Sequence, residues 1–423
     1  MPERSRPHCP TRPAASAGLR LLATVCLMTT LAILAPATVP AKERPKPEEL
    51  VVNGGFVVHS SGNLRYRQDE LFIPASTLKI LTALVALERL GGAYRFETHL
   101  WLDSDGALTI KGYGDPTLTS EAVLDIAVKL AALGVRRVVA LRLDDTAFDL
   151  AGEMAGEENS PHGYDAPNGA LAVNFNSVPL TVGKNGNVTT VDSPPPLLPL
   201  VREMSVGLPP GQYRRNIAIL GGDKQRPPAL RYVAELFTAQ LRAAGIAVSG
   251  SWQPGKAPPG TRPLLVHQST SPLEEIIRHC LEFSTNFTAN QLFLAIGAKE
   301  FGLPATWGKG RRAVTAYAAA TLGLGEKHLV VREGAGLSRH NRISAAAFLP
   351  ILERFRPYAH LLHEKDGVPL KSGTLSGVYC YAGYFRREEA LVPFALLLNQ
   401  EENTRARLLA LLQEGAKAAA STR

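Results

Sequence analysis

The pattern of hydrophobic positions divides the chain into a leader and three regions of different texture. An uncharged run of fourteen residues, Leu21–Leu34, stands near the N-terminus. Further on, leucines, isoleucine and valine occupy nearly every face of the segment between Pro74 and Gly91. Proline suits the first turn of a helix and glycine suits its end. A helix that is apolar on all sides is buried on all sides, so this segment predicts a central core helix.

From residue 97 the pattern changes to short strands that are separated by turn residues. Strands over 97–102 and 108–111 flank Asp103–Gly106, which is typical of a hairpin turn. Helices are expected over 120–133 and 229–244, and further short strands over 137–143, 174–182 and 188–191. This texture predicts that residues 97–263 form an inserted α+β region of their own.

The third region returns to longer helices and then to strands. A capping box at Ser271 starts a helix, which breaks at Ser284–Asn286 before a second helix follows. Strands are expected over 369–375, 378–385 and 394–398, and a Leu-rich helix over 405–418. That last helix either packs on the sheet or touches a membrane surface, so any membrane contact is peripheral. The main domain is predicted to comprise residues 42–96 and 264–423.

The leader has the three parts of a secretory signal. Four arginines precede the apolar run, and small residues follow it at Ala35–Ala37 and Val39–Ala41. The alternative is an uncleaved anchor, because the uncharged stretch is just long enough to span a bilayer. We expect residues 1–41 to be a signal peptide and the protein to be periplasmic.

Composition excludes several classes of protein. Hydrophobic residues make up 45% of the 423 residues and charged residues 20%, which is ordinary for a globular chain of two or three domains. Removing the leader lowers the formal net charge from +8 to +5 without leaving a basic stripe, so no nucleic-acid partner is expected. Cys280 and Cys380 are either bridged or free. No cysteine or histidine spacing is typical of a metal site, and neither metal nor cofactor is expected.

The first candidate for chemistry is Ser76-Thr77-Leu78-Lys79 at the start of the core helix. Residues three apart on a helix face the same side. A serine hydroxyl is a weak nucleophile until a base accepts its proton, and a lysine is a base only when it is neutral. Burial on this apolar helix would lower the pKa of Lys79 and favour the neutral amine.

Two further patterns follow later in the chain. Ser284-Thr285-Asn286 offers a hydroxyl that can relay a proton and an amide that can hold a peptide backbone. Lys371-Ser372-Gly373-Thr374 lies on a predicted strand, which can pair with an extended substrate. Lys371 and Ser372 suit a terminal carboxylate, and Gly373 leaves room for the substrate. The backbone N–H groups of Thr374 and Ser76 could form an oxyanion hole.

The order S-x-x-K, S-x-N, K-[ST]-G resembles the motif triple of penicillin-binding proteins and class A β-lactamases. The 208 residues between Ser76 and Ser284 and several side motifs make the chain similar to the peptidase S13 family. This family comprises the class C low-molecular-mass penicillin-binding proteins, which are D-Ala-D-Ala carboxypeptidases. The side motifs are Gly114–Leu118, Asp144–Phe148, Asn174–Asn176 and Gly336–Arg339. The resemblance covers about residues 50–415 and implies a serine β-lactamase/DD-peptidase fold with a large insertion.

The resemblance also implies the reaction and its partners. Ser76 would form an acyl-enzyme with peptidoglycan stem peptides, and β-lactam antibiotics would acylate it. Relatives also cleave cross-links and read a diaminopimelate side chain, for which Asp145 and Arg339 are the candidates here; structural ion pairs are the alternative.

Three departures from the family pattern stand out. Ser372 replaces the commoner threonine, Asn290 stands where an acid is expected, and Glu333-Gly334-Ala335 replaces Asp-Gly-Ser.

A β-lactamase-like hydrolase and a non-catalytic penicillin- or wall-binding scaffold remain as alternative functions.

Overall fold

The computed structural model describes residues 45–59, 64–150, 160–190, 197–221, 227–388 and 390–421. The predicted signal peptide, residues 1–41, lies outside these ranges. Within them, no helix combines the length and the apolar character needed to cross a bilayer.

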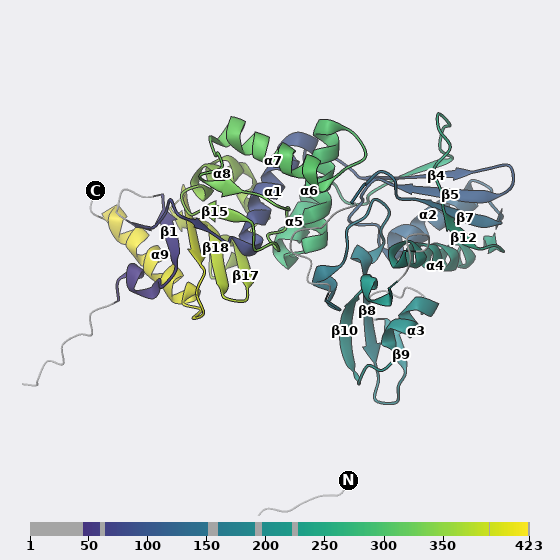
Figure 1. Cartoon of the computed structure of the whole chain (residues 1–423), viewed down its shortest axis with the longest axis horizontal. Coiled ribbons are helices and arrows are strands. Elements are labelled where there is room, and N and C mark those ends of the chain that lie inside the picture. Colours follow the sequence, from purple (N-terminus) through teal and green to yellow (C-terminus); the bar gives the residue numbers. More distant parts are fainter. Residues whose placement is uncertain are drawn as a thin grey trace, which may run out of the picture. The chain divides into compact units, whose positions relative to one another are not determined.

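A six-stranded antiparallel sheet forms the centre of the main domain (Figure 1). Its strands, in spatial order, are β16 (His363–Lys365), β17 (Val368–Leu375), β18 (Val378–Arg387), β19 (Ala390–Leu398), β1 (Gly54–Val58) and β2 (Arg65–Tyr66). The three strands predicted over 369–398 are therefore confirmed as neighbours, and β1 from the start of the chain pairs with β19.

Both faces of this sheet are buried, and successive residues alternate between them. On β1, Phe56 and Val58 pack toward α9 (Arg405–Ser421), whereas Val57 packs toward the helices on the opposite face. Leu408 and Leu412 of α9 are fully buried against this sheet, which agrees with the packing interpretation of the C-terminal helix.

Five helices contribute to the apolar core on the other side of the sheet (Figure 1). They are α1 (Lys79–Leu90), α5 (Leu273–Phe283), α6 (Asn286–Phe301), α7 (Trp307–Leu322) and α8 (Phe348–Phe355). Helix α1 is buried over Lys79–Leu87, and Gly91, with φ 89°, follows its last residue. The predicted core helix is therefore confirmed. It begins at Lys79 rather than Pro74, because Ala75–Leu78 form a 3₁₀ turn in front of it. A small sheet of β14 (Leu329–Val330), β15 (Arg342–Ser344) and β3 (Leu71–Phe72) lies beside them.

Two larger sheets are built from residues 97–268, so their last strand lies just beyond the predicted boundary of the inserted region at residue 263. One has five strands, in the order β12 (Trp252–Pro254), β7 (Ala140–Asp144), β5 (Ala107–Gly112), β4 (Glu97–Leu102) and β13 (Leu265–Gln268). The other has three, β10 (Gly211–Asn216), β8 (Ser177–Val182) and β9 (Val188–Thr190). A two-stranded pair joins β6 (Arg137–Val138) and β11 (Ala247–Val248). Helices α2 (Ser120–Ala132), α3 (Pro199–Ser205) and α4 (Pro228–Ala243) share one apolar core with these strands.

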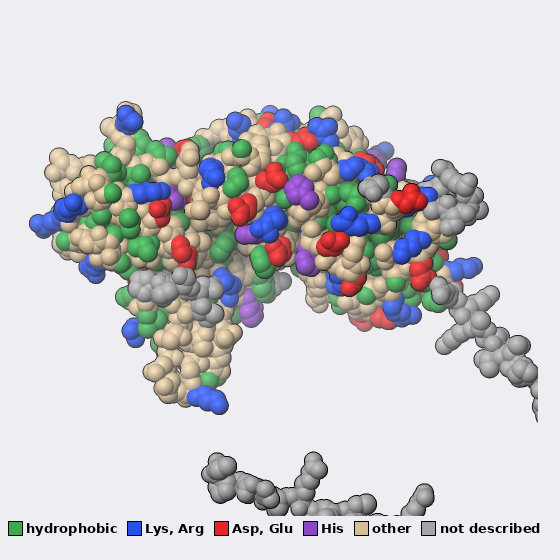
Figure 2. All heavy atoms as spheres, turned by 180° about the vertical axis from the view of Figure 1, so that it is seen from behind, with side chains coloured by type: hydrophobic (Ala, Val, Ile, Leu, Met, Phe, Trp, Pro, Cys, Tyr) green, Lys and Arg blue, Asp and Glu red, His purple; other side chains and the backbone are tan. Residues whose placement is uncertain are grey.

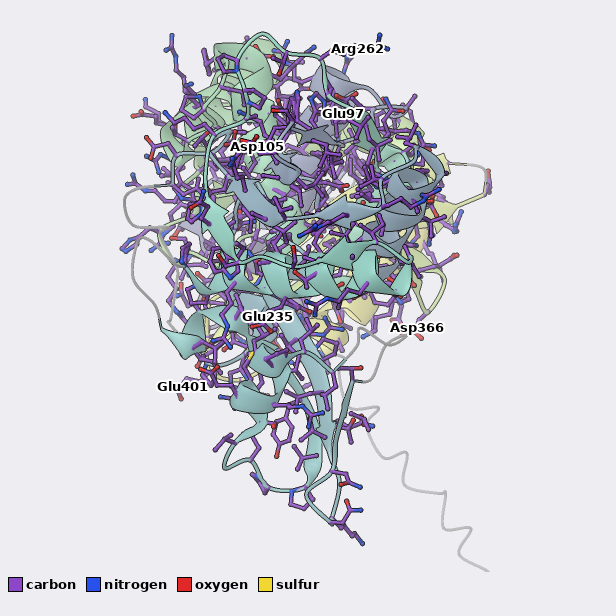
Figure 3. The ribbon with its side chains drawn as sticks, turned by 90° about the vertical axis from the view of Figure 1, so that its right-hand side faces the viewer. Glu97, Asp105, Glu235, Arg262, Asp366 and Glu401 are labelled. Carbon is purple, nitrogen blue, oxygen red and sulfur yellow. The ribbon has the colours of Figure 1, made fainter. Side chains whose placement is uncertain are left out.

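Charged side chains of both signs lie on the outside of the fold. Lysine and arginine are interspersed with aspartate and glutamate on the face drawn in Figure 2. Arg262 in the inserted region and Asp366 in the turn before β17 are exposed and lie at the margins of the view in Figure 3.

Candidate active site

The 3₁₀ turn before α1 brings the first predicted pair into contact. Ser76 is half-buried in this turn and Lys79 is 1% exposed at the first position of α1. Because the two residues are three apart, the Lys79 Nζ atom lies 2.9 Å from Ser76 Oγ. Ala75, immediately before the serine, has a left-handed φ of 46°, a sparsely populated conformation for a residue with a side chain.

The second motif meets this pair from the break between two helices. Helix α5 ends at Phe283, Ser284 adopts a left-handed φ of 55°, and α6 begins at Asn286. The break places Asn286 Oδ1 2.8 Å from Lys79 Nζ, across 207 residues of sequence. Lys79 thus donates to both Ser76 and Asn286.

The third motif lies on β17 directly beside the serine. A Cβ atom on Gly373 would lie 2.7 Å from Pro74 O and 3.0 Å from Ser76 N, so only glycine allows this approach. Lys371 is 3% exposed, and its Nζ donates to the Ser372 carbonyl at 3.0 Å. Lys371 and Ser372 line a cavity of about 140 Å³ at the edge of the sheet.

The chain matches the profile of a known protein family. The profile of the D-Ala-D-Ala carboxypeptidase 3 (S13) family matches residues 55–202 and 225–370, which is more than half of the chain. The chain belongs to this S13 family.

Two curated relatives agree with the assignment. A D-alanyl-D-alanine carboxypeptidase of Actinomadura sp. (strain R39) is 29% identical over 429 residues, covering 83% of this chain and 78% of that protein. The D-alanyl-D-alanine carboxypeptidase DacB of Haemophilus influenzae is 26% identical over 356 residues, covering 74% and 72%. The chain is therefore a serine-type D-Ala-D-Ala carboxypeptidase by family.

Solved structures support the fold. Penicillin binding protein 4 (dacB) from Haemophilus influenzae superposes with a TM-score of 0.70 at 20% identity, covering 88% of this chain and 98% of that one. A second structure of that protein, complexed with a novel β-lactam, superposes with a TM-score of 0.67 at 20% identity and the same coverage. The fold expected from the motifs is confirmed.

Burial sets the charge of both lysines of this S13 carboxypeptidase. Burial is the main cause that lowers the pKa of Lys79 from 10.5 to about 8, and the nearby Glu333 carboxylate opposes that change. The pKa of Lys371 falls to about 7, first because of burial and then because of the positive charge on Lys79. A substrate carboxylate would raise the pKa of Lys371 again, because an opposite charge favours the ammonium form.

Sequence reasoning did not identify Glu333 as a functional residue. Its fully buried carboxylate accepts from Ala335 N at 2.7 Å, Ser338 N at 3.2 Å and Asn341 Nδ2 at 2.7 Å. These bonds hold the loop 333–338, whose Ala335 carbonyl accepts from Lys79 Nζ at 2.6 Å. Glu333 had been noted only as a departure from the family pattern.

Another departure from the family pattern, Asn290 of α6, is bonded to the same loop. Asn290 Oδ1 accepts from Gly334 N at 2.8 Å, and Thr82 Oγ1 of α1 donates to Gly334 O at 2.7 Å. A Cβ atom on Gly336, which has φ 80°, would lie 1.9 Å from the Ala75 carbonyl oxygen. The loop is therefore fixed against α1, α6 and the serine turn at once.

Arg405, the first residue of α9, is the second residue that the motifs did not reveal. Its Nη1 donates to Gly373 O and to Thr374 Oγ1, both at 2.9 Å, and its guanidinium lies 4.4 Å from the Tyr381 ring centroid. Since Thr374 Oγ1 accepts this bond, the threonine hydroxyl keeps its own hydrogen for another acceptor. No catalytic motif includes Arg405, so sequence patterns carried no signal for it.

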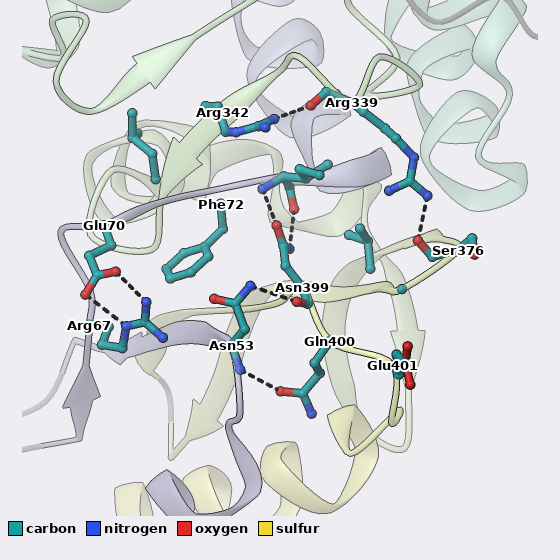
Figure 4. Close-up of a pocket in the computed structure, with 14 residues that line it drawn as sticks. Asn53, Arg67, Glu70, Phe72, Arg339, Arg342, Ser376, Asn399, Gln400 and Glu401 are labelled. Carbon is teal, nitrogen blue, oxygen red and sulfur yellow. Dashed lines mark hydrogen bonds and ion pairs between the residues drawn. The ribbon is translucent and has the colours of Figure 1, made fainter.

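Arg339 and Asp145, the expected substrate-reading pair, make separate contacts. Arg339 donates to the Ser376 carbonyl at 2.6 Å, beyond the end of β17, beside a polar pocket of about 540 Å³ (Figure 4). Asp145 follows β7, and among the described residues no hydrogen bond or ion pair joins it to Arg339 or to the three motifs. Burial raises the pKa of the Asp145 carboxyl.

The two cysteines in the described part of the chain are free and buried. Cys280 Sγ lies 3.5 Å from Thr285 O, and Cys380 Sγ lies 3.5 Å from Ile73 O. Of the two possibilities that the sequence left open, the structure shows the unbridged one. In the described part of the chain, no three His, Cys, Asp or Glu side chains come together as a metal ion would require.

Proposed function

We propose that this protein cleaves the terminal D-Ala-D-Ala bond of peptidoglycan stem peptides through an acyl-enzyme on Ser76. The observation that carries the proposal is the position of Lys79 Nζ, 2.9 Å from Ser76 Oγ and 2.8 Å from Asn286 Oδ1, in a site that lowers its pKa to about 8. An amine with this pKa is neutral in about a tenth of the molecules at pH 7, far more than an ordinary lysine, and the neutral form accepts the serine proton.

In the proposed acylation, Ser76 Oγ forms a bond to the scissile carbonyl carbon while Lys79 Nζ takes the hydroxyl proton. The backbone N–H groups of Ser76 and Thr374 stabilise the developing oxyanion. The C–N bond then breaks, and the departing amine receives a proton that Lys79 supplies through Ser284. Water later attacks the acyl carbon and gives a proton to Lys79. The ester bond to Ser76 Oγ then breaks, Lys79 returns the proton to that oxygen, and the shortened peptide is released.

The remaining motif residues hold the substrate in this proposal. Asn286 orients the acyl chain by its amide. Lys371, Ser372 and Thr374 bind the terminal carboxylate, while Gly373 lets their strand approach the serine turn. Asp145 and Arg339 are proposed to read the side chain of the diamino acid during cross-link cleavage.

The proposed ligands and location follow from the same site. β-Lactam antibiotics would acylate Ser76, because their strained amide presents a similar carbonyl to the serine; the related Haemophilus influenzae protein has a β-lactam complex. The N-terminal leader supports export to the periplasm, where peptidoglycan is found. No step of this mechanism uses a metal or a cofactor.

The test uses the purified protein, fluorescent penicillin and a pentapeptide ending in D-Ala-D-Ala. Slow release of the label together with production of D-Ala is expected, and Ser76→Ala should abolish both. Ser104→Ala, at an exposed serine in the turn between β4 and β5, is the matched control and should behave as wild type. Rapid penicillin turnover without D-Ala would instead indicate a β-lactamase, and no turnover of either substrate would indicate a binding scaffold.

A further inference from the structure

A pocket of about 480 Å³ lies on the five-stranded sheet, and none of the residues that line it belongs to the three motifs. Trp101 on β4 is paired with Thr109 on β5, which is paired in turn with Arg142 on β7. The residues next to them on two of these strands, Leu108 and Leu141, pack into the apolar core of the inserted region. Because successive residues of a strand point to opposite faces, the pocket lies on the face turned away from that core.

The connection from β12 to β13 closes one side of the pocket. Its Thr261 carbonyl accepts from Trp101 Nε1 at 3.1 Å, and its Ala257 N–H donates to Asp144 Oδ2 at 2.7 Å. These two bonds attach the connection to β4 and to β7, and the Asp144 side chain is fully buried. The pocket is therefore built by the fold of this region, before any ligand binds.

The inner wall of the pocket presents a hydroxyl that has no partner. Thr109 is 3% exposed and lines the pocket, and its Oγ1 forms no hydrogen bond with any of the described residues. Arg142 forms an ion pair with Asp103 on the same wall, and both side chains keep further donors and acceptors for a ligand. A polar group that is removed from water without a partner is unfavourable, so a ligand that bonds to Thr109 stabilises this wall.

The connection gives the pocket a positive charge. Lys256 and Arg262 lie on it, are exposed, and form no ion pair within the part of the chain that the structure describes. Among the described residues that line the pocket, Asp103 is the one acid, and Arg142 neutralises it. Two unpaired positive charges therefore favour a ligand that carries negative charge.

The lining combines features that match a sugar ring. The flat indole of Trp101, together with Leu264, offers apolar cover to the C–H groups on the face of a pyranose. The Thr109 hydroxyl and the Arg142–Asp103 pair suit the hydroxyl and acetamido groups on the rim of the same ring. An inorganic anion would make no use of the indole, and an apolar peptide segment would leave the hydroxyl and both cations without partners.

We propose that this pocket binds the glycan strand of peptidoglycan where the strand carries no stem peptide. A sugar ring packs on Trp101, and the free lactyl carboxylate of an N-acetylmuramic acid residue meets Lys256 and Arg262. This inference rests on the proposed function for the identity of the polymer, since a peptidase of stem peptides works beside the glycan that carries them. It assigns the inserted region a part in holding the enzyme on its polymeric substrate.

The experiment measures the binding of fluorescent glycan strands, stripped of stem peptides, to the purified protein by anisotropy at low ionic strength. Lys256→Ala/Arg262→Ala should raise the Kd about tenfold, because two exposed ion pairs with the carboxylates are lost. The same variant should bind a neutral chitin oligosaccharide as the wild type does. Trp101→Ala should weaken the binding of both ligands, and so should Thr109→Val, which keeps the shape of the side chain but removes the hydroxyl.

Controls separate this proposal from a general effect of charge and from the proposed function. Lys184→Ala/Arg137→Ala removes two exposed cations that do not line the pocket, so its Kd should equal that of the wild type. D-Ala release from a soluble pentapeptide should keep the wild-type rate in every variant, because the pocket is separate from the motifs.

Three results would overturn the glycan site and leave the peptidase intact. They are no binding of the stripped strands by the wild type, an equal loss in the control variant, and equally tight binding of poly-L-glutamate, which carries carboxylates but no sugar. Failure of the wild type to release D-Ala would overturn the proposed function instead, and anisotropy would still report whether the pocket binds glycan.

Discussion

Lys79 shows how burial decides the chemistry of a single side chain. The amine is 1% exposed and has three hydrogen-bond acceptors, of which two, Ser76 and Asn286, belong to the motifs. Desolvation disfavours the ammonium form, so the pKa falls to about 8 in the folded protein. The same residue on an exposed helix would stay charged and could not accept a proton.

This lowered pKa predicts a pH dependence for acylation. Below pH 8 Lys79 is mostly protonated, so the acylation rate at saturating benzylpenicillin should rise with pH and level off above about 8. Stopped-flow measurement of labelling between pH 5 and pH 9 checks this expectation. A rate that is constant or falls between pH 5 and pH 8 would contradict Lys79 as the base.

Glu333 should influence Lys79 through both charge and position. Its carboxylate raises the pKa of Lys79, so Glu333→Gln should move the rising part of the pH profile to lower pH. The amide NH₂ would also face either the donor Ala335 N or the donors Ser338 N and Asn341 Nδ2, which should lower the free energy of unfolding by about 1–3 kcal/mol. Both the pH profile and thermal unfolding are measured.

Glu333→Asp separates the two effects. The aspartate keeps the negative charge but shortens the side chain, so the variant should lose stability while its pH profile stays near that of the wild type. A purely structural role for Glu333 would predict no displacement of the profile in either variant.

Strand β17 is held in position by contacts on both of its sides. Gly373 allows the strand to approach the serine turn, and Arg405 of α9 holds the opposite side through Gly373 O and Thr374 Oγ1. The C-terminal helix therefore contributes to the strand that is proposed to bind the substrate carboxylate, besides covering the sheet.

Arg405→Ala should weaken the binding of substrates that carry a terminal carboxylate. Without the guanidinium, Thr374 loses the bond that orients its hydroxyl, and KM for the pentapeptide should rise about five- to tenfold while kcat changes less. Steady-state kinetics gives this split. Arg407→Ala, whose side chain is 64% exposed on the same helix, is the matched control, and equal effects of the two variants would refute the role of Arg405.

The whole molecule is held by separate apolar cores. One core combines the helices with one face of the six-stranded sheet, and a second combines the other face with α9. A third consists of residues between Leu100 and Val248 only. We propose that residues 97–263 form an inserted domain with this third core, attached to the main domain through contacts such as Asn168 with Phe287.

One substitution in the third core and one in the core of the main-domain helices test whether residues 97–263 form a separate domain. Phe237 of α4 is fully buried in the third core, so Phe237→Ala should cost about 3–5 kcal/mol there. Hydrogen exchange should then show loss of protection within 97–263 while penicillin still labels the protein. Phe348→Ala in α8 should instead lower protection around α1 and reduce labelling. Simultaneous loss in both regions from either variant would contradict the division.

Local patterns predicted part of the elements and the order of the motifs. The core helix, the strands over 369–398 and the break at Ser284 follow from spacing of apolar residues and from turn residues, which depend on neighbours in the chain. The resemblance to S13 enzymes likewise rests on short segments such as Ser76–Lys79 and Lys371–Thr374. The start of α1 differed only at an element boundary, whereas α7 and α8 were not predicted from the sequence.

Contacts between residues far apart in the sequence could be identified only from the folded structure. Lys79 meets Asn286 across 207 residues, Glu333 reaches Lys79 through the carbonyl of Ala335, and Arg405 touches Thr374 from a helix that covers the far side of the sheet. None of these has a periodic or motif signature, because each depends on how completed helices and strands pack together. Burial, which lowers the pKa of Lys79, is likewise a property of the packed site and not of the residues beside it in the chain.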